Sequence, residues 1–308
     1  MNKIIVSQLR ELHQHYRDEQ DMFRAMAYGK AATTIGKLDF VIQSVDQLEG
    51  IKGIGTSIRD KISQILENGM IENNPVDTKD TVRSKMLTLF QTIHGIGPAA
   101  AKKLYDIEKI TTLDKLKSQN KKDPNLLTHA QKIGLKYREE FLNRIDRSVI
   151  CECENMIKSI LNEYFVQGFK IMTAGSYRRG KTSSGDMDIM LCSDTFLLSE
   201  AIEVLISRGL IIDILALDKK KFMGVAQIPG NDPFRIDIFM VSNENWWVAM
   251  VTHTGPKELN TQMRTIAATM GMKLSDQGLK KGTETIPIQS EADLFRKLNM
   301  KPIKPTKR

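Results

Sequence analysis

The sequence predicts a multidomain protein, with an all-helical first half and a mixed α and β second half that ends in a small α+β subdomain. Three observations predict this fold class. The 308 residues can form two or more domains with cores of their own. Before residue 150, apolar residues recur at helical spacing, as at Ile54, Ile58, Ile62 and Ile65. After residue 165, short apolar and β-branched segments are typical of strands.

An internal repeat occupies the helical half. The strings IKGIGTSIRDKISQIL, from Ile51, and IHGIGPAAAKKLYDI, from Ile93, share an apolar-x-Gly-Ile-Gly pattern followed by an amphipathic helix. Two copies are too few for a solenoid. The glycines allow a tight turn between two short helices, and the second helix begins with unpaired N–H groups. Such a turn can hold a phosphate or, through its carbonyls, a cation that bridges to one.

The second half contains three predicted strands, FKIMTAG, DMDIMLCS and FRIDIFMV. Residues two apart on a strand point to one face, so Asp186 and Asp188 project together while Met187 and Ile189 enter the core. Helical strings such as SEAIEVLISRG and KELNTQMRTIAATMG lie between or after the strands. This alternation predicts a mixed α and β fold.

The paired aspartates indicate a metal site. Adjacent carboxylates repel each other and persist where a divalent cation neutralises them, and Mg²⁺ favours oxygen ligands. Asp237 lies in a similar apolar strand, and a neighbouring strand could bring it beside the pair. Three carboxylates on two strands would form a site for two metal ions about 4 Å apart, which activate a 3′-hydroxyl and stabilise a pyrophosphate leaving group.

The string before these aspartates, GSYRRGKTSSG, is suited to bind phosphate. A strand ending in a Gly-Ser turn can direct backbone N–H groups and the Ser176 hydroxyl at phosphate oxygens. Arg179 adds a fork of donors, and Gly185 permits a close backbone approach. A Gly-Ser turn or an Asp-x-Asp pair alone is a weak signal. Their conjunction with a later strand aspartate is much stronger.

The composition suits a polyanionic partner and a reducing compartment. Lys and Arg number 45 against 37 Asp and Glu, which gives a formal charge of +8. No apolar run approaches the roughly 18 residues of a membrane span, so we expect a soluble, intracellular protein that binds no membrane. Cys151, Cys153 and Cys192 lack the spacing of a zinc site and are expected to be free thiols. The string NMKPIKPTKR predicts a flexible basic tail or a solvated terminus.

These motifs resemble those of the family X DNA polymerases, of the beta and lambda type. The resemblance runs through nearly the whole chain and is carried by the GIG hairpins, GSYRRG, SSGDMDIML, KFMGVAQIP, RIDIF, THTGPKELNTQMR and IPIQSEADLFRKL. It implies helix-hairpin-helix domains followed by a nucleotidyltransferase palm with a mixed β-sheet and a small C-terminal α+β subdomain. The implied boundaries are 1–78 for a lyase-like helical domain, 79–145 for a DNA-binding subdomain with the second hairpin, 146–242 for the palm and 243–308 for a nucleotide-selecting subdomain with a basic tail.

The resemblance also implies residue roles in the palm. Two Mg²⁺ ions, with Mn²⁺ as a substitute, would be held by three aspartates, Asp186, Asp188 and Asp237. The triphosphate would be held by Ser176, Arg179 and Gly185. Asn260 would touch the minor-groove edge of the incoming nucleotide and Arg264 the template strand, and these two are i and i+4 on one helix face. Family members commonly have an aromatic pair where this chain has Thr252 and His253, and we expect His253 to be an exposed loop residue without a catalytic role.

For the hairpins, the resemblance implies contacts with the DNA backbone and a bound monovalent cation. The glycines of the two turns, Gly53, Gly55, Gly95 and Gly97, would approach the DNA. A Na⁺ or K⁺ ion would be bound by backbone carbonyls, those of Ile51, Ile54, Ile93 and Ile96.

A second activity is implied in the N-terminal region, the removal of a sugar remnant from a 5′ end. The family's nucleophile is a lysine on the helix after the first hairpin, and Lys61 occupies that position. An unprotonated amine would form a Schiff base with the sugar aldehyde before β-elimination. Arg24, Tyr28 and Lys30 would surround it and hold the 5′-phosphate, while Ser57 stands where the family often has a lysine.

Together these features predict a monomeric, template-directed DNA polymerase that fills short gaps in base-excision-type repair, with dNTPs and gapped or nicked double-stranded DNA as substrates. The alternative is a template-independent, small-molecule or RNA-end nucleotidyltransferase with the same palm, although small-molecule enzymes have no use for two duplex-gripping hairpins. A non-catalytic DNA-binding scaffold is disfavoured by the complete aspartate set. The location would be nuclear in a eukaryote, or a cytoplasmic factory or virion for a virus.

Overall fold

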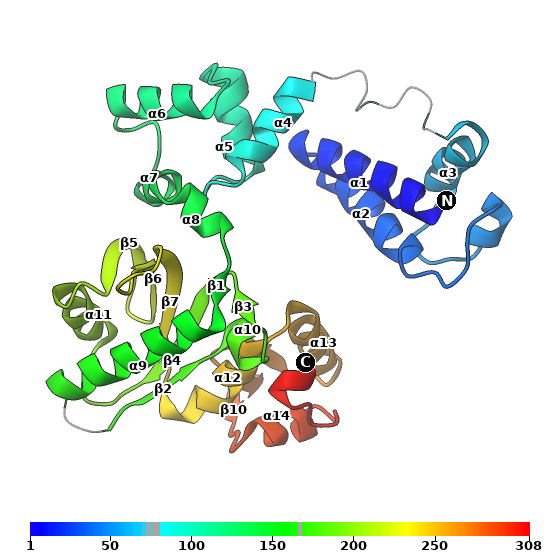
Figure 1. The fold of residues 1–308 in the computed structure, drawn as a ribbon. Coiled ribbons are helices and arrows are strands. Elements are labelled where there is room, and N and C mark those ends of the chain that lie inside the picture. Colours follow the sequence, from blue (N-terminus) through cyan, green and yellow to red (C-terminus); the bar gives the residue numbers. More distant parts are fainter. Residues whose placement is uncertain (70, 72–74, 76–80, 166–167) are drawn as a thin grey trace. The chain divides into compact units, whose positions relative to one another are not determined.

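The computed structural model forms two compact units, Met1–Gln131 and Lys132–Arg308 (Figure 1). It describes residues 1–69, 71, 75, 81–165 and 168–308. Within these residues every strand lies in the second unit. The predicted change from an all-helical first part to a mixed second part is therefore confirmed.

The first unit is built from helices that follow the predicted apolar periodicity. Its elements are α1 (Asn2–Asp18), α2 (Met22–Ile35), the 3₁₀ helix η1 (Val45–Leu48), α3 (Thr56–Asn68), α4 (Thr81–Phe90), α5 (Pro98–Lys102), the π-helix η2 (Lys103–Ile107) and α6 (Leu113–Lys122). Asp21 caps α2 by accepting a hydrogen bond from the Arg24 N–H. The predicted stripe on and before α3 is buried at all four positions, Ile54, Ile58, Ile62 and Ile65. These side chains pack with α1 in one core.

The second unit centres on a five-stranded sheet of order β2-β4-β7-β6-β5. Its strands are β2 (Lys170–Thr173), β4 (Met187–Cys192), β5 (Ile211–Leu217), β6 (Lys221–Ala226) and β7 (Phe234–Met240). β4 and β7 are parallel, whereas the other neighbours are antiparallel. A short pair, β1 (Ile145–Asp146) and β3 (Ser183–Ser184), lies beside it, and α7 (His129–Lys136) and α8 (Arg138–Leu142) precede β1.

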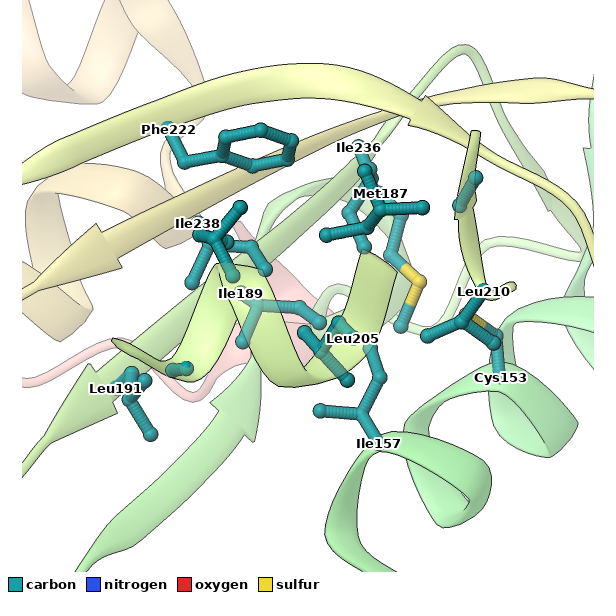
Figure 2. Close-up of a cluster of buried hydrophobic side chains, with 14 of the residues drawn as sticks. Cys153, Ile157, Met187, Ile189, Leu191, Leu205, Leu210, Phe222, Ile236 and Ile238 are labelled. Atoms are coloured by element: carbon teal, nitrogen blue, oxygen red, sulfur yellow. The ribbon is translucent and has the colours of Figure 1, made fainter. Parts of the chain in front are cut away.

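Two helices cover one face of this sheet, α9 (Arg147–Tyr164) and α11 (Leu198–Ser207). Figure 2 shows Cys153 and Ile157 of α9 and Leu205 of α11 facing side chains of β4 and β7. Because side chains alternate along a strand, the residues between these apolar ones point to the opposite face. Part of that second face is covered by α12 (Trp246–Thr254), which packs against Met190 of β4.

A small α+β subdomain completes the chain, as predicted. It contains α13 (Lys257–Thr269), the antiparallel strands β8 (Lys273–Ser275), β9 (Gly278–Lys281) and β10 (Glu284–Ile286), α14 (Glu291–Lys297) and the 3₁₀ helix η4 (Pro305–Lys307). The tail expected after α14 is only partly solvated, because Lys301, Lys304 and Lys307 are exposed whereas the last residue is not. The Arg308 side chain is 1% exposed, pairs with Glu291 and lies with its guanidinium carbon 5.3 Å from the centre of the Phe295 ring.

In the described part of the chain, no helix is both long and apolar enough to cross a membrane. The prediction of free thiols is confirmed. Cys151 is exposed, and Cys153 and Cys192 are buried without a disulfide.

The sheet core makes a stability prediction. Phe222 of β6 is fully buried, so Phe222→Ala is expected to cost about 3–5 kcal/mol of unfolding free energy through the cavity it leaves. Urea unfolding followed by tryptophan fluorescence measures this, because both tryptophans, Trp246 and Trp247, lie in the same unit. Leu217→Ala, at a 41% exposed position on β5, is the control and should cost less than about 1 kcal/mol.

Candidate active site

Three aspartates come together on the second face of the sheet. Asp188 lies directly opposite Asp237 in the register of the parallel strands β4 and β7. Asp186 immediately precedes β4, and the intervening Met187 is fully buried with Ile189. The neighbouring strand therefore brings Asp237 beside the pair, as the sequence predicted.

Two basic side chains, Arg235 and Lys221, lie against these carboxylates. The Arg235 Nη2 atom is 3.2 Å from Asp186 Oδ2 and 3.8 Å from Asp237 Oδ1. The Lys221 Nζ atom is 3.5 Å from Asp237 Oδ2. Sequence reasoning did not assign either cation. Arg235 could have been found from its place two residues before Asp237, on the same face of β7.

Asp188 and Asp237 resist ionisation. Burial raises the pKa of Asp188 to about 7, and the charges of Asp186 and Asp237 add to this rise. Burial likewise raises the pKa of Asp237, against the opposing effect of Arg235 and Lys221. Additional positive charge would therefore stabilise the ionised form of these carboxylates.

The donor set fits a divalent cation. Asp237 is 6% exposed, and its Oδ1 atom has no hydrogen-bond partner, which is costly unless another group completes it. Carboxylate oxygens are the ligands that hard cations prefer. As the described side chains stand, no three His, Cys, Asp or Glu residues are close enough to hold a metal ion. Because Arg235 contacts both Asp186 and Asp237, we expect its contacts to give way when a cation binds.

The strand β2 leads into α10 (Gly175–Arg178), a single helical turn in place of the predicted Gly-Ser turn. Gly175 has a φ of 55°. A Cβ atom at this position would lie 2.3 Å from Asp188 Oδ2. Only glycine satisfies both the backbone angle and the contact. The Gly175 backbone therefore lies directly against the Asp188 carboxylate.

The predicted phosphate donors lie in and after this turn. Ser176 Oγ donates to Ser184 Oγ at 2.7 Å, and Arg179 donates from Nη1 to the carbonyl of Thr254. A Cβ on Gly185 would meet no atom within 4 Å, so the backbone there is open to a ligand. Ser176 and Arg179 thus both have hydrogen-bond partners within the protein.

Helix α13 carries the two residues expected to read the nucleotide and the template. Asn260 and Arg264 lie one turn apart on it, with Arg264 exposed and Asn260 half-buried. The Asn260 Nδ2 atom donates to the Thr252 carbonyl at 2.6 Å. This bond uses one amide hydrogen and leaves the second for a ligand.

Both hairpins have the same backbone geometry. The first glycine of each turn has a positive φ, 95° at Gly53 and 83° at Gly95. The second glycine is the N-cap residue of the following helix, Gly55 before α3 and Gly97 before α5. The predicted repeat is therefore a structural repeat.

The turn carbonyls are partly occupied. Ile51 O accepts from Ile54 N at 3.1 Å, and Ile93 O accepts from Ile96 N at 3.0 Å. A carbonyl oxygen has two lone pairs, so each retains one for a cation.

Comparison with known families assigns the four parts of the chain. Residues 1–71 match a helix-hairpin-helix domain, 88–142 the fingers domain of DNA polymerase lambda, 144–243 the DNA polymerase beta palm and 249–308 the DNA polymerase beta thumb. The chain belongs to the family X DNA polymerases, of the beta and lambda type. Polymerases of this family use divalent metal ions, which agrees with the carboxylate cluster.

Curated relatives match along the entire chain. DNA polymerase lambda of Arabidopsis thaliana is 29% identical, and that of Rattus norvegicus is 28% identical. DNA nucleotidylexotransferase of Xenopus laevis is 25% identical. The alignments cover 100% of this chain and 62%, 56% and 68% of these three proteins, respectively.

The expectation of an exposed loop histidine is wrong, because His253 is half-buried in the last turn of α12 with its ring centre 4.0 Å from that of Phe239. Burial lowers its pKa to about 4, and nearby Lys221 acts in the same direction. His253 is therefore a neutral ring that packs beside the carboxylate site.

Acid should destabilise the protein through His253. Between pH 6.5 and 4 the unfolded chain binds a proton at this residue and the folded chain does not, so folding stability falls as the pH falls through this window. The loss is expected to reach about 3 kcal/mol. His253→Phe should lose correspondingly less stability between pH 7 and 4 in urea titrations. Leu217→Ala, at an exposed position on β5, changes no titratable group and should retain the wild-type pH dependence.

The predicted lyase residues lie on α2 and α3. Tyr28 is 6% exposed, and its ring stacks on Tyr16 with centres 5.5 Å apart. Its side chain is hydrogen-bonded to Ser57, one turn before Lys61 on α3. The guanidinium of the exposed Arg24 lies 5.3 Å from the Tyr16 ring. Lys61 is half-buried, and Tyr28 joins the two helices next to it.

Proposed function

We propose that the protein is a template-directed DNA polymerase that fills short gaps in base-excision-type DNA repair. The observation that carries this proposal is the β4–β7 register that sets Asp188 opposite Asp237, against a turn that Gly175 holds in contact with Asp188. Nucleotidyl transfer needs carboxylates and phosphate donors within reach of one another. The two hairpins add a grip on duplex DNA that small-molecule nucleotidyltransferases do not require.

In this proposal, Asp186, Asp188 and Asp237 hold two divalent cations, Mg²⁺ or in its place Mn²⁺. When bound, these ions lower the pKa of the primer 3′-hydroxyl and neutralise charge on the pyrophosphate. Asp237, which Lys221 contacts, accepts the hydroxyl proton as general base.

The remaining residues position the dNTP. Ser176, Arg179 and the open backbone at Gly185 bind the triphosphate oxygens. Asn260 presents its second amide hydrogen to the minor-groove edge of the base, and Arg264 contacts the template strand.

The hairpins supply binding without sequence readout. The glycine turns at Gly53–Gly55 and Gly95–Gly97 place helix N-termini at phosphates of gapped or nicked DNA. A Na⁺ or K⁺ ion on the carbonyls of Ile51 and Ile54, and of Ile93 and Ile96, would bridge to them. We expect a monomer, located in the nucleus if the source is eukaryotic, whose affinity for DNA falls steeply with salt.

Template dependence tests this proposal. The assay offers each dNTP separately, with Mg²⁺, on one-nucleotide gaps that differ only in the templating base. The proposal expects insertion of the complementary nucleotide in each case. Addition of the same nucleotides whatever the template would support a template-independent transferase instead, and no addition to DNA at all would contradict both readings.

A second activity is proposed for the N-terminal region, because Tyr28 and Ser57 fix α2 against the helix that carries Lys61. The Lys61 amine would add to the aldehyde of a 5′-deoxyribose phosphate and release water to form a Schiff base. Loss of a proton and cleavage of the C3′–O bond would then release the sugar from the 5′-phosphorylated strand. Borohydride should trap the wild type on such DNA and not Lys61→Ala. Lys37→Ala, at an exposed position on the first unit, should be trapped like the wild type.

A further inference from the structure

A buried ion pair joins α14 to the phosphate turn α10. Glu291 Oε1 lies 2.6 Å from Arg178 Nη2, and Glu291 Oε2 pairs with Arg308. The side chains are 14%, 18% and 1% exposed for Glu291, Arg178 and Arg308, respectively. One carboxylate therefore holds two arginines that would otherwise repel each other in a place with little water.

The segment that ends in Arg308 is itself fixed. Arg308 Nε donates to the Ile303 carbonyl at 2.9 Å, and its guanidinium lies over Phe295. A Cβ on Gly180, at the end of GSYRRG, would lie 3.4 Å from Thr306 Cγ2. This segment therefore packs directly on the loop that carries the phosphate donors.

Arg178 also links α10 to the end of α12, next to the helix that carries Asn260. Its Nη1 atom donates to Thr254 Oγ1 at 3.0 Å, and the next residue, Arg179, donates to the Thr254 carbonyl. Thr254 is fully buried at the end of α12, three residues before α13 begins. Two arginines of one turn thus grip a single residue next to the helix that carries Asn260.

We propose that Glu291 and Arg308 are positioning residues of the nucleotide site. They hold Arg178 on Thr254, which sets the distance between the triphosphate donors on and after α10 and the base-reading face of α13. The Arg178 guanidinium is therefore occupied by Glu291 and Thr254 within the protein. Arg179 is the arginine that donates hydrogen bonds to the triphosphate. This inference rests on the proposed function of the site, and it adds residues far along the chain that touch no substrate.

The affinity for the nucleotide can be measured without the nucleotidyl-transfer step, and it tests the inference. The Kd of the correct dNTP is measured on a one-nucleotide gap whose primer ends in a dideoxynucleotide, for Glu291→Gln, Arg308→Met and the double variant. Each single change should weaken binding about tenfold, and the double variant should be no worse than Glu291→Gln because both arginines act through one carboxylate. Arg308→Lys keeps the charge and should recover part of the affinity.

The control is Arg296→Met, because Arg296 lies on the same helix but is 67% exposed and pairs only with Asp293 among the ion pairs of the described residues. It should bind the dNTP like the wild type. An unchanged Kd in Glu291→Gln and Arg308→Met, together with a lower unfolding midpoint by tryptophan fluorescence, would show a purely structural role and overturn the inference. Wild-type protein that binds the dNTP but inserts nothing on an extendable primer would sink the proposed function and leave the positioning effect measurable.

Discussion

Asp188→Asn should abolish nucleotide insertion and stabilise the metal-free protein. Removing one carboxylate from the cation site is expected to reduce the insertion rate at least about 10³-fold, since charge stabilisation by bound cations is worth several kcal/mol. The gain in stability is expected because the pKa of Asp188 is about 7 in the folded state, well above the ordinary value of an aspartate.

The sign of the stability change depends on pH. Between about pH 4 and 7 the folded protein retains a proton at Asp188 that the unfolded chain has lost, so stability falls as the pH rises. At pH 8, without divalent cations, Asp188→Asn should therefore be roughly 2–4 kcal/mol more stable than the wild type in urea titrations. Asp194→Asn, in an exposed loop, is the control for both assays and should change neither. Insertion within about tenfold of the wild type would contradict the assigned role.

Gly175→Ala should disable the site through the contact it makes with Asp188. The new methyl group would start 2.3 Å from Asp188 Oδ2, at a φ of 55° that disfavours any side chain. Overpacking and backbone strain together are expected to cost about 2–5 kcal/mol of stability. Displacing Asp188 is expected to lower the insertion rate at least about 10²-fold.

The matched control, Gly209→Ala, separates the effect of backbone strain from the effect of the contact with Asp188. Gly209 has a φ of 71°, and a Cβ there would meet no atom within 4 Å. Gly209→Ala should cost about 1–2 kcal/mol and leave the insertion rate unchanged. If Gly175→Ala behaves like Gly209→Ala in single-turnover insertion, the turn does not depend on its contact with Asp188.

The strands that carry the aspartates were predictable from the sequence because their pattern is local. Asp186 and Asp188 alternate with Met187 and Ile189, and this period of two places the carboxylates on one face whatever lies around them. The apolar run around Asp237 likewise indicated a strand. The helical stripe through Ile62 is equally local, and it was found for the same reason.

The partners of these residues were not predictable from local patterns. Lys221 reaches Asp237 only because β6 pairs with β7, and Arg178 reaches Glu291 across more than a hundred residues. A basic string with prolines looks solvated when it is considered alone, which is why the burial of Arg308 was missed. The strand β5 was not predicted because Asp213 interrupts its apolar run, where it binds Lys136 and Tyr137. The strands β8 to β10 are too short, at three or four residues, for a period to be visible.

The central claim is that the carboxylates on β4 and β7 carry out templated insertion at a gap. The most direct test compares wild type, Asp237→Ala and the loop control Asp232→Ala in single-turnover insertion of the correct dNTP with Mg²⁺. The DNA has a one-nucleotide gap with a 5′-phosphate, and the same primer is also tested without the downstream strand. We expect wild type and Asp232→Ala to insert the complementary nucleotide, faster on the gap, and Asp237→Ala to bind the DNA without inserting. Insertion by Asp237→Ala at the wild-type rate would contradict the assignment of the active site.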